Sequence, residues 1–246
     1  MSGEKGIVVH AGTLDYAFAL SLMDAIVCIK RRKPWPDIVL LLEHPPVITL
    51  GRRATEKEIR CPIRMLKNRG IDVHHVERGG MATYHGPGQL VGYLLFDLKR
   101  NHIGPSQLVD LIERAIIAVL TEHGIAAEQS DAHRGVWVDH HKIASIGIGV
   151  KGGITFHGFA LNCTPNLSHF DLINPCGLGP RSMTSMAQIS GKSIALSTIA
   201  RQLTTCLPNF IGFDLANEPL EKLLSDVYDE HPEAFLGIAL EKETAV

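Results

Sequence analysis

The 246-residue sequence has no strong charge of either sign and no long apolar run. Its formal net charge is −2, whereas nucleic-acid-binding proteins of this size usually carry a basic excess or stripe. No stretch approaches the roughly 20 apolar residues of a membrane-spanning helix. Residues 1–5 show neither a signal-peptide core nor an Arg-rich transit character. We therefore expect a soluble, cytoplasmic protein without nucleic-acid or membrane partners.

Cysteine is scarce and scattered, and histidine, although frequent, does not group as a metal site would. No two of the five cysteines are close enough for a CxxC pair, which argues against a disulfide framework or a thiolate zinc site and fits a reducing compartment. The 13 histidines include two adjacent pairs, but neighbours on a strand point to opposite faces, and no HExxH motif occurs. We expect no bound metal and a free reactive thiol among the five cysteines.

Apolar residues, 45% of the chain, recur at helical and strand spacings. They predict helices near residues 14–33, 62–68, 106–123, 199–207 and 220–228, with Thr13 as the first N-cap, and strands near 38–42, 47–50, within 73–98, 136–138, 142–150 and 154–162. We expect the basic run Lys30 to Lys33, at the first helix end, to complement the helix dipole and face solvent. The order predicts a mixed α/β (α+β) single domain over residues 1–246.

The most unusual segment is Arg78-Gly79-Gly80-Met81-Ala82-Thr83-Tyr84-His85-Gly86-Pro87-Gly88-Gln89. Paired glycines let a backbone approach a ligand closely, and polar side chains crowd the same stretch. The plain structural interpretation is a set of tight hairpin turns. The spacing matches neither GxGxxG nor a Walker loop, so it does not predict phosphate binding by those routes.

Two further segments carry possible chemistry. Lys142 enters the apolar stretch Ile143 to Gly147, where a lysine either reaches solvent or lies in a site that lowers its pKa. Cys176 lies between Pro175 and Gly177, which would hold its thiol on a constrained, accessible turn. A lone cysteine is more often a small buried apolar residue, and Cys28 and Cys206, on apolar helical faces, are interpreted in that way.

Taken together, these segments resemble the octanoyltransferase family of lipoate biosynthesis, also called lipoyl(octanoyl) transferases. The matching motifs stand in order between about residues 38 and 190. They are Leu42-Glu43-His44-Pro45-Pro46-Val47, Leu50-Gly51-Arg52-Arg53, Arg78-Gly79-Gly80, Thr83 to Gln89, Gly135-Val136-Trp137-Val138, Lys142-Ile143-Ala144, His157 to Asn162, Pro175-Cys176-Gly177 and Thr184-Ser185. One motif alone would be weak, whereas the combination is specific.

The resemblance implies a fold like the catalytic domain of biotin and lipoate protein ligases, with a mixed β-sheet flanked by helices. It implies catalysis by a Cys176–Lys142 pair and transfer of octanoyl from acyl carrier protein to a lysine, through a thioester on Cys176. The implied acceptors are lipoyl domains of 2-oxoacid dehydrogenases and the glycine cleavage H protein. The implied acyl pocket consists of Arg78, Gly79, Gly80, Met81, Ala82, Thr83, Tyr84, His85, Ser145, Ile146, Gly147, Gly158, Phe159 and Ala160.

The implied chemistry needs no cofactor, because the substrate brings the octanoyl group on its own phosphopantetheine arm. Exchange of one thioester for another needs no ATP, and forming an amide from a thioester is downhill. Two alternatives stay open. An ATP-dependent lipoate ligase of the same fold would activate a free acid and would not need Cys176. A non-catalytic module that binds acyl carriers would not need Cys176 together with Lys142.

Overall fold

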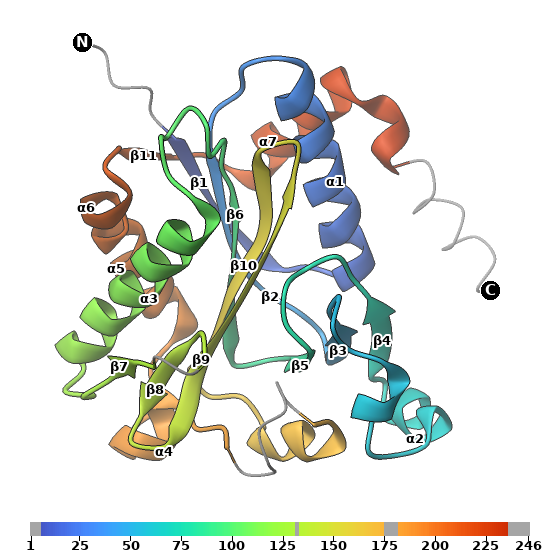
Figure 1. Ribbon diagram of the computed structural model, residues 1–246, viewed down its shortest axis with the longest axis vertical. Coiled ribbons are helices and arrows are strands. Elements are labelled where there is room, and N and C mark those ends of the chain that lie inside the picture. Colours follow the sequence, from blue (N-terminus) through green and yellow to red (C-terminus); the bar gives the residue numbers. More distant parts are fainter. Residues whose placement is uncertain (1–5, 131–132, 175–181, 236–246) are drawn as a thin grey trace.

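Two β-sheets organise residues 6–130, 133–174 and 182–235, the part of the chain that the computed structural model describes (Figure 1). The larger sheet has the strand order β11-β1-β2-β6-β10-β9-β8-β7, and the smaller one β4-β3-β5. The strands are β1 Gly6–Thr13, β2 Ile38–Glu43, β3 Val47–Leu50, β4 Asp72–His75, β5 Ala82–His85, β6 Gln89–Leu95, β7 Glu128–Gln129, β8 Val136–Val138, β9 His141–Lys151, β10 Ile154–Asn162 and β11 Leu215–Asn217. Each sheet combines parallel and antiparallel pairs, which confirms the predicted mixed α/β class.

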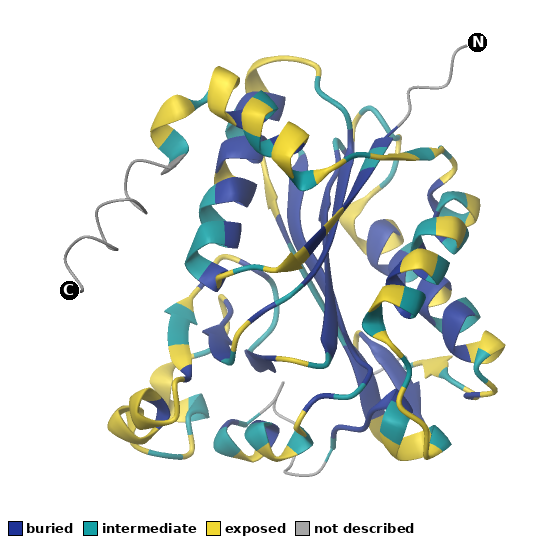
Figure 2. Ribbon diagram, turned by 180° about the vertical axis from the view of Figure 1, so that it is seen from behind, coloured by how far each residue is buried: buried dark blue, intermediate teal, exposed yellow. Residues whose placement is uncertain are grey.

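Helices cover both faces of the larger sheet (Figures 1 and 2). The α-helices are α1 Tyr16–Arg32, α2 Ile63–Asn68, α3 Pro105–Glu122, α4 Met186–Ser190, α5 Leu196–Cys206, α6 Pro208–Ile211 and α7 Leu220–Glu230, and the 3₁₀ turns are η1 Glu56–Glu58, η2 Leu167–Leu172 and η3 Pro232–Phe235. α1 and α7 pack on one face, and α3, α5 and α6 on the other. None of the described helices is both long and apolar enough to cross a membrane.

The central strand β2 shows why the sequence folds into three layers. Val39 and Leu41 belong to the apolar cluster under α3, whereas Leu40 and Leu42 belong to the cluster under α1. Successive strand residues point to opposite faces, so a strand covered on both sides needs an uninterrupted apolar run. The run Ile38 to Leu42 meets this need, and Figure 2 shows the middle of the sheet buried.

Both ends of α1 correct a sequence prediction. Thr13 is the last residue of β1, and Asp15 caps the helix by accepting a hydrogen bond of 3.0 Å from the Phe18 amide. Lys30 does not face solvent with the rest of the basic run. Its side chain is buried, and Nζ lies 2.8 Å from Asp37 Oδ1 at the start of β2. A carboxylate brought in by the next strand therefore makes burial of this lysine possible.

Candidate active site

A cavity opens where β5 and the loop before it meet β6, β9 and β10. It encloses about 430 Å³ of unfilled space, part of it open to solvent. The wall consists of Arg78, Gly79, Gly80, Thr83, His85, Tyr93, Ser145, Ile146, Gly147, His157, Gly158, Phe159 and Ala160. A concave site with apolar walls and a few convergent polar groups is typical of small-molecule binding.

Most of the predicted acyl pocket lies on this one wall. The structure brings together Arg78, Gly79, Gly80, Thr83, His85, Ser145, Ile146, Gly147, Gly158, Phe159 and Ala160. Met81, Ala82 and Tyr84 do not line the cavity. Because strand residues alternate between faces, Thr83 and His85 reach it while Ala82 and Tyr84 join the apolar cluster of Ile48 and Leu50 behind β5. Contact between the lining residues and an acyl group stays a prediction.

Two wall residues, Tyr93 and His157, were missed as site residues. Tyr93 lies in an otherwise apolar strand and gave no separate signal. His157 belongs to a quoted family motif, and its backbone φ of 57° gives a further signal that only the structure reveals. Such a conformation is uncommon for a residue other than glycine and often marks functional sites.

Glycines let the Arg78–Gly80 loop pack directly on β9. The Gly79 amide donates a hydrogen bond of 2.9 Å to the carbonyl of Ile148. A Cβ added to Gly147 would lie only 2.8 Å from the Gly79 carbonyl oxygen. Any larger residue at position 147 would push the loop away from the strand, so the sequence signal of clustered glycine has a direct steric cause.

Arg78 ties the same loop to β3 by hydrogen bonds. Its side chain is buried, with Nη2 2.7 Å from both the carbonyl and the hydroxyl oxygen of Thr49, and Nη1 3.0 Å from the Gly79 carbonyl. Thr49 lies on β3, so the guanidinium ties the loop to the smaller sheet. A planar, multiply bonded guanidinium holds such geometry better than an ammonium would.

Hydrogen bonds that join β5, β6 and β10 fix the tautomer of His85. Gln89 Nε2 donates to the Tyr84 carbonyl and to Asn162 Oδ1, which leaves Gln89 Oε1 to accept from His85 Nδ1 at 2.7 Å. Asn162 Nδ2 in turn donates to the Thr184 carbonyl. His85 Nε2 is therefore an acceptor in the neutral ring. Burial lowers the pKa of His85 well below its ordinary value.

His44 and His157 are also neutral. His44 Nδ1 donates to the Leu14 carbonyl at 2.7 Å, so Nε2 accepts from the Tyr93 hydroxyl at 2.7 Å. Burial lowers the pKa of His44 to about 4 and that of His157 to about 3. His157 Nε2 is buried without a hydrogen-bond partner. The polar part of the cavity wall is thus uncharged apart from Arg78 near neutral pH.

Lys142, the predicted catalytic lysine, is buried near the start of β9, three residues before the cavity residue Ser145. Its Nζ donates to the carbonyl of Arg134 at 2.9 Å and lies 5.0 Å from the centre of the Trp137 ring. The Lys142 amide donates to the Ser182 carbonyl at 2.7 Å, and its own carbonyl accepts from the Thr184 amide. The lysine is therefore held inside the protein and does not reach out to solvent.

The predicted nucleophile Cys176 lies outside the described residues. Of the four described cysteines, Cys28, Cys61 and Cys206 are half-buried, and Cys163 is fully buried. Burial raises the pKa of the Cys163 thiol to about 12 and raises that of Cys206. Since the thiolate is the nucleophile, neither is suited to attack near neutral pH. Within the described ranges, no three His, Cys, Asp or Glu side chains group as metal ligands would.

The sequence resembles curated octanoyltransferases over most of its length. It is 38% identical over 211 residues to the octanoyltransferase of Desulforamulus reducens, covering 85% of this chain and 92% of the relative. It is 40% identical over 218 residues to that of Caldicellulosiruptor bescii, covering 88% and 96%. These matches confirm the resemblance that the motifs indicated.

Solved structures confirm the fold. A lipoate-protein ligase A bound with ATP superimposes with a TM-score of 0.71 at 14% identity, covering 92% of this chain and 94% of the other. A bipartite lipoate protein ligase described with its E2 lipoyl domain, from Thermoplasma acidophilum, gives 0.67 at 14%, covering 92% of each chain. A biotin protein ligase from Aquifex aeolicus gives 0.52 at 11%, covering 85% and 71%.

The family model for the lipoyl protein ligase A/B catalytic domain matches residues 15–207, which include every wall residue of the cavity, Lys142 and Cys176. The chain belongs to the lipoyl protein ligase A/B catalytic domain family.

Proposed function

We propose that this chain transfers an octanoyl group from acyl carrier protein to a lysine of a lipoyl domain, through a thioester on Cys176. Its relatives make the chain an octanoyltransferase of lipoate biosynthesis. The observation that supports the thioester mechanism is that one strand, β9, supplies both a buried lysine and part of a cavity wall. Lys142 precedes the wall residue Ser145 by three positions on this strand, which supports a basic group near the cavity.

In the first half-reaction, the Cys176 thiolate attacks the thioester carbonyl of the donor. The bond from the acyl carbon to the carrier sulfur breaks, and the phosphopantetheine sulfur leaves as a thiol after taking a proton from the Lys142 ammonium, which becomes the neutral amine. The Lys142 ammonium would lower the pKa of the Cys176 thiol and so raise the thiolate fraction. Chain connectivity supports this pairing, because Ser182, whose carbonyl accepts from the Lys142 amide, stands 182 − 176 = 6 positions from Cys176.

In the second half-reaction, a lysine amine of the acceptor attacks the acyl-Cys176 carbonyl. The amine loses a proton, the amide bond forms, and Cys176 leaves as a thiolate. Neutral Lys142 would accept that proton as general base. Each tetrahedral intermediate needs hydrogen-bond donors for its oxyanion. The Gly79 amide already donates to Ile148, which leaves the amides of Gly80 and Cys176 as candidates.

An anionic donor fits the surface beside the cavity. The segment 52–69 contains seven exposed basic residues and two glutamates, and seven minus two leaves +5 in a chain whose net charge is −2. The amides of Arg52 and Arg53 donate to the carbonyls of Arg78 and Gly80 on the cavity wall. A phosphopantetheine phosphate on an acidic carrier protein would be attracted to this surface. The donor carries the octanoyl group, so no cofactor is proposed.

Intact mass spectrometry tests the covalent step. Wild-type protein incubated with octanoyl-acyl carrier protein and no ATP should gain one octanoyl group that hydroxylamine removes. Cys176→Ala should gain none, and Cys163→Ala, the matched control at a buried thiol, should behave as wild type. Wild-type protein without an adduct would contradict the thioester mechanism. Transfer that requires ATP and a free acid would instead point to a ligase.

A further inference from the structure

A buried carboxylate lies behind the catalytic lysine. Glu113, on the inner face of α3, is 2% exposed. Its Oε1 accepts from the Gly135 amide at 2.8 Å and its Oε2 from Gln129 Nε2 at 2.7 Å. Arg134 Nη1 lies 3.6 Å from Glu113 Oε2 and also pairs with Asp110 at the surface. Burying a carboxylate costs free energy unless the group is paired and hydrogen-bonded. The buried Glu113 carboxylate finds its partners in Gln129, Arg134 and Gly135, close together in the sequence.

The loop that Glu113 holds is the one that holds Lys142. The peptide group between Arg134 and Gly135 has its N–H on Glu113 Oε1 and its carbonyl oxygen 2.9 Å from Lys142 Nζ. One planar peptide unit therefore connects the carboxylate to the ammonium. A carboxylate at the N–H polarises the peptide and makes its carbonyl oxygen a stronger acceptor for a cation.

Gly135 allows this close arrangement. Its φ of 128° lies in the region that favours glycine. A Cβ at this position would lie 2.6 Å from the Ala144 carbonyl oxygen and 3.0 Å from Lys142 Cε. The peptide thus rests directly against the lysine side chain, and a shift of the loop moves the Arg134 carbonyl, an acceptor of the Lys142 ammonium.

We propose that Glu113 is a positioning residue for Lys142, acting through the Arg134–Gly135 peptide. The inference rests on the proposed role of Lys142 as the partner of Cys176. Glu113 keeps the carbonyl of Arg134 in place and electron-rich, and so stabilises the lysine as a cation in its buried position. Loss of the Glu113 charge lowers the fraction of Lys142 that is protonated, and with it the fraction of Cys176 that is thiolate.

The test measures the rate of iodoacetamide alkylation of Cys176 against pH in the full chain, by peptide mass. The main variant is Glu113→Gln, which keeps the size and one oxygen acceptor but removes the charge. The control is Asp110→Asn, which removes the surface partner of Arg134 and leaves the Glu113–Gly135 bond intact. Each is made in wild type and in Lys142→Ala. The charged side chains that face Glu113 are Arg134 and, through it, Asp110. The Asp110→Asn control shows how much the Arg134–Asp110 ion pair alone affects the labelling profile.

We expect Glu113→Gln to slow alkylation at pH 7 roughly threefold or more by shifting the labelling profile to higher pH. The same change in the Lys142→Ala background should have no further effect, and Asp110→Asn should leave the profile unchanged. An equal effect of Glu113→Gln in both backgrounds indicates general destabilisation and overturns the inference. So does no effect in wild type when Lys142→Ala does slow alkylation.

The alkylation profile of Lys142→Ala tests the proposed role of Lys142 separately. If Lys142→Ala leaves the profile of Cys176 unchanged, Lys142 loses its role and this inference falls with it. The octanoyl adduct on Cys176 can form in either case, so the covalent step is judged by the mass experiment alone.

Discussion

At the scale of single residues, the neutral histidines beside the cavity make the protein sensitive to acid. His44 and His157 have pKa values of about 4 and 3 because burial penalises the charged ring, and the pKa of His85 is lowered by the same cause. In the unfolded chain a histidine titrates near 6.5. Between these values the unfolded chain binds protons that the folded one does not.

Stability should therefore be complete above pH 6.5 and fall as the pH drops toward 4. Each of these histidines contributes a slope of up to about 1.4 kcal/mol per pH unit in that window. Urea unfolding across the window checks the size of the fall. His44→Asn, which keeps a polar side chain that does not titrate, should show a shallower fall than wild type. An unchanged slope would mean that His44 is not the source.

The site residues found from sequence were those with an unusual local pattern. The glycines of segment 78–85 are needed because its loop packs closely on β9 at Gly79 and Gly147, so the local sequence could point to this segment. The burial of Lys30 could not be predicted from local sequence, because its partner Asp37 approaches only when β2 lies beside α1. The pairing of Glu113 with a loop peptide likewise depends on the tertiary fold.

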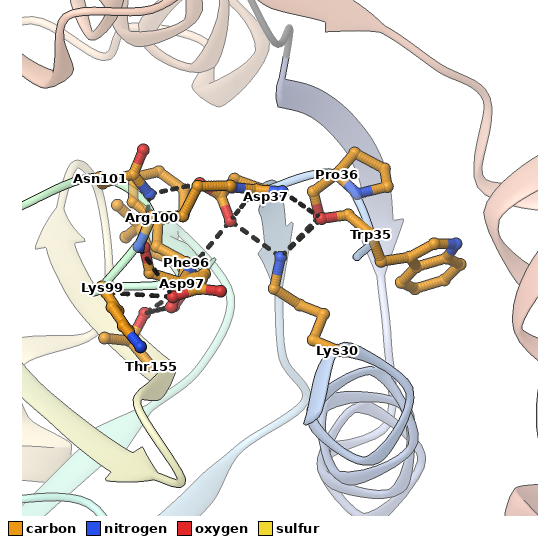
Figure 3. A network of polar contacts seen from close by, with 11 residues as sticks. Lys30, Trp35, Pro36, Asp37, Phe96, Asp97, Lys99, Arg100, Asn101 and Thr155 are labelled. Atoms are coloured by element: carbon orange, nitrogen blue, oxygen red, sulfur yellow. Dashed lines mark hydrogen bonds and ion pairs between the residues drawn. The ribbon is translucent and has the colours of Figure 1, made fainter. Parts of the chain in front are cut away.

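At the scale of elements, one carboxylate connects a helix end, a strand and a loop (Figure 3). Asp37 Oδ1 accepts from Lys30 Nζ at 2.8 Å, from Arg100 Nη2 at 2.7 Å and from the Asp97 amide at 2.9 Å. Its Oδ2 accepts from Asn101 Nδ2. Burial alone would raise the pKa of Asp37, but Lys30 and these hydrogen bonds lower it. The network fixes the entry of β2 against the segment after β6.

Removing this carboxylate should be strongly destabilising. Asp37→Ala leaves the Lys30 ammonium buried with the carbonyls of Trp35 and Pro36 but without a carboxylate, which should lower the free energy of unfolding by about 3–5 kcal/mol. In Lys30→Met the same change should cost clearly less, since no buried cation remains to be left without its partner. Urea unfolding of the four proteins gives the coupling. Additive losses would show that the two side chains do not act as a pair.

Helices and strands could be predicted where the apolar repeat extended over many residues or where turn residues marked the ends. The helix at 106–123 and the strand at 154–162 match α3 and β10 almost residue for residue. β1 was missed. It is interrupted by an irregularity between His10 and Gly12 and depends on its parallel partners β2 and β11, which are distant in sequence. Local sequence cannot report such partners.

At the scale of the whole molecule, the uneven charge bears on how the proposed acyl carrier protein donor would be recruited. Arg52 and Arg53 are exposed beside the cavity wall, in the segment of net charge +5. That residues 1–246 form a single catalytic domain stays a prediction, and the family match spans 15–207.

Reversing both charges, in Arg52→Glu with Arg53→Glu, should raise the KM for octanoyl-acyl carrier protein about tenfold at low salt and leave kcat nearly unchanged. Exposed charges steer encounter more than they alter chemistry, and salt screens them. Lys222→Glu, a single charge reversal at an exposed site on α7, is the control to be compared with Arg52→Glu alone and should have little effect. A fall in kcat at unchanged KM would place the arginines in another role.

If the cavity holds the acyl chain and Lys142 acts as proposed, the sharing of β9 between them constrains how selectivity for acyl length can be changed. Enlarging Ser145 or Gly147 to shorten the slot would also disturb the strand that aligns the lysine. Phe159 and Thr83 lie on other strands of the same wall. Redesign toward shorter or longer acyl groups should therefore begin at those two positions, where substrate choice can be altered with the least penalty to turnover.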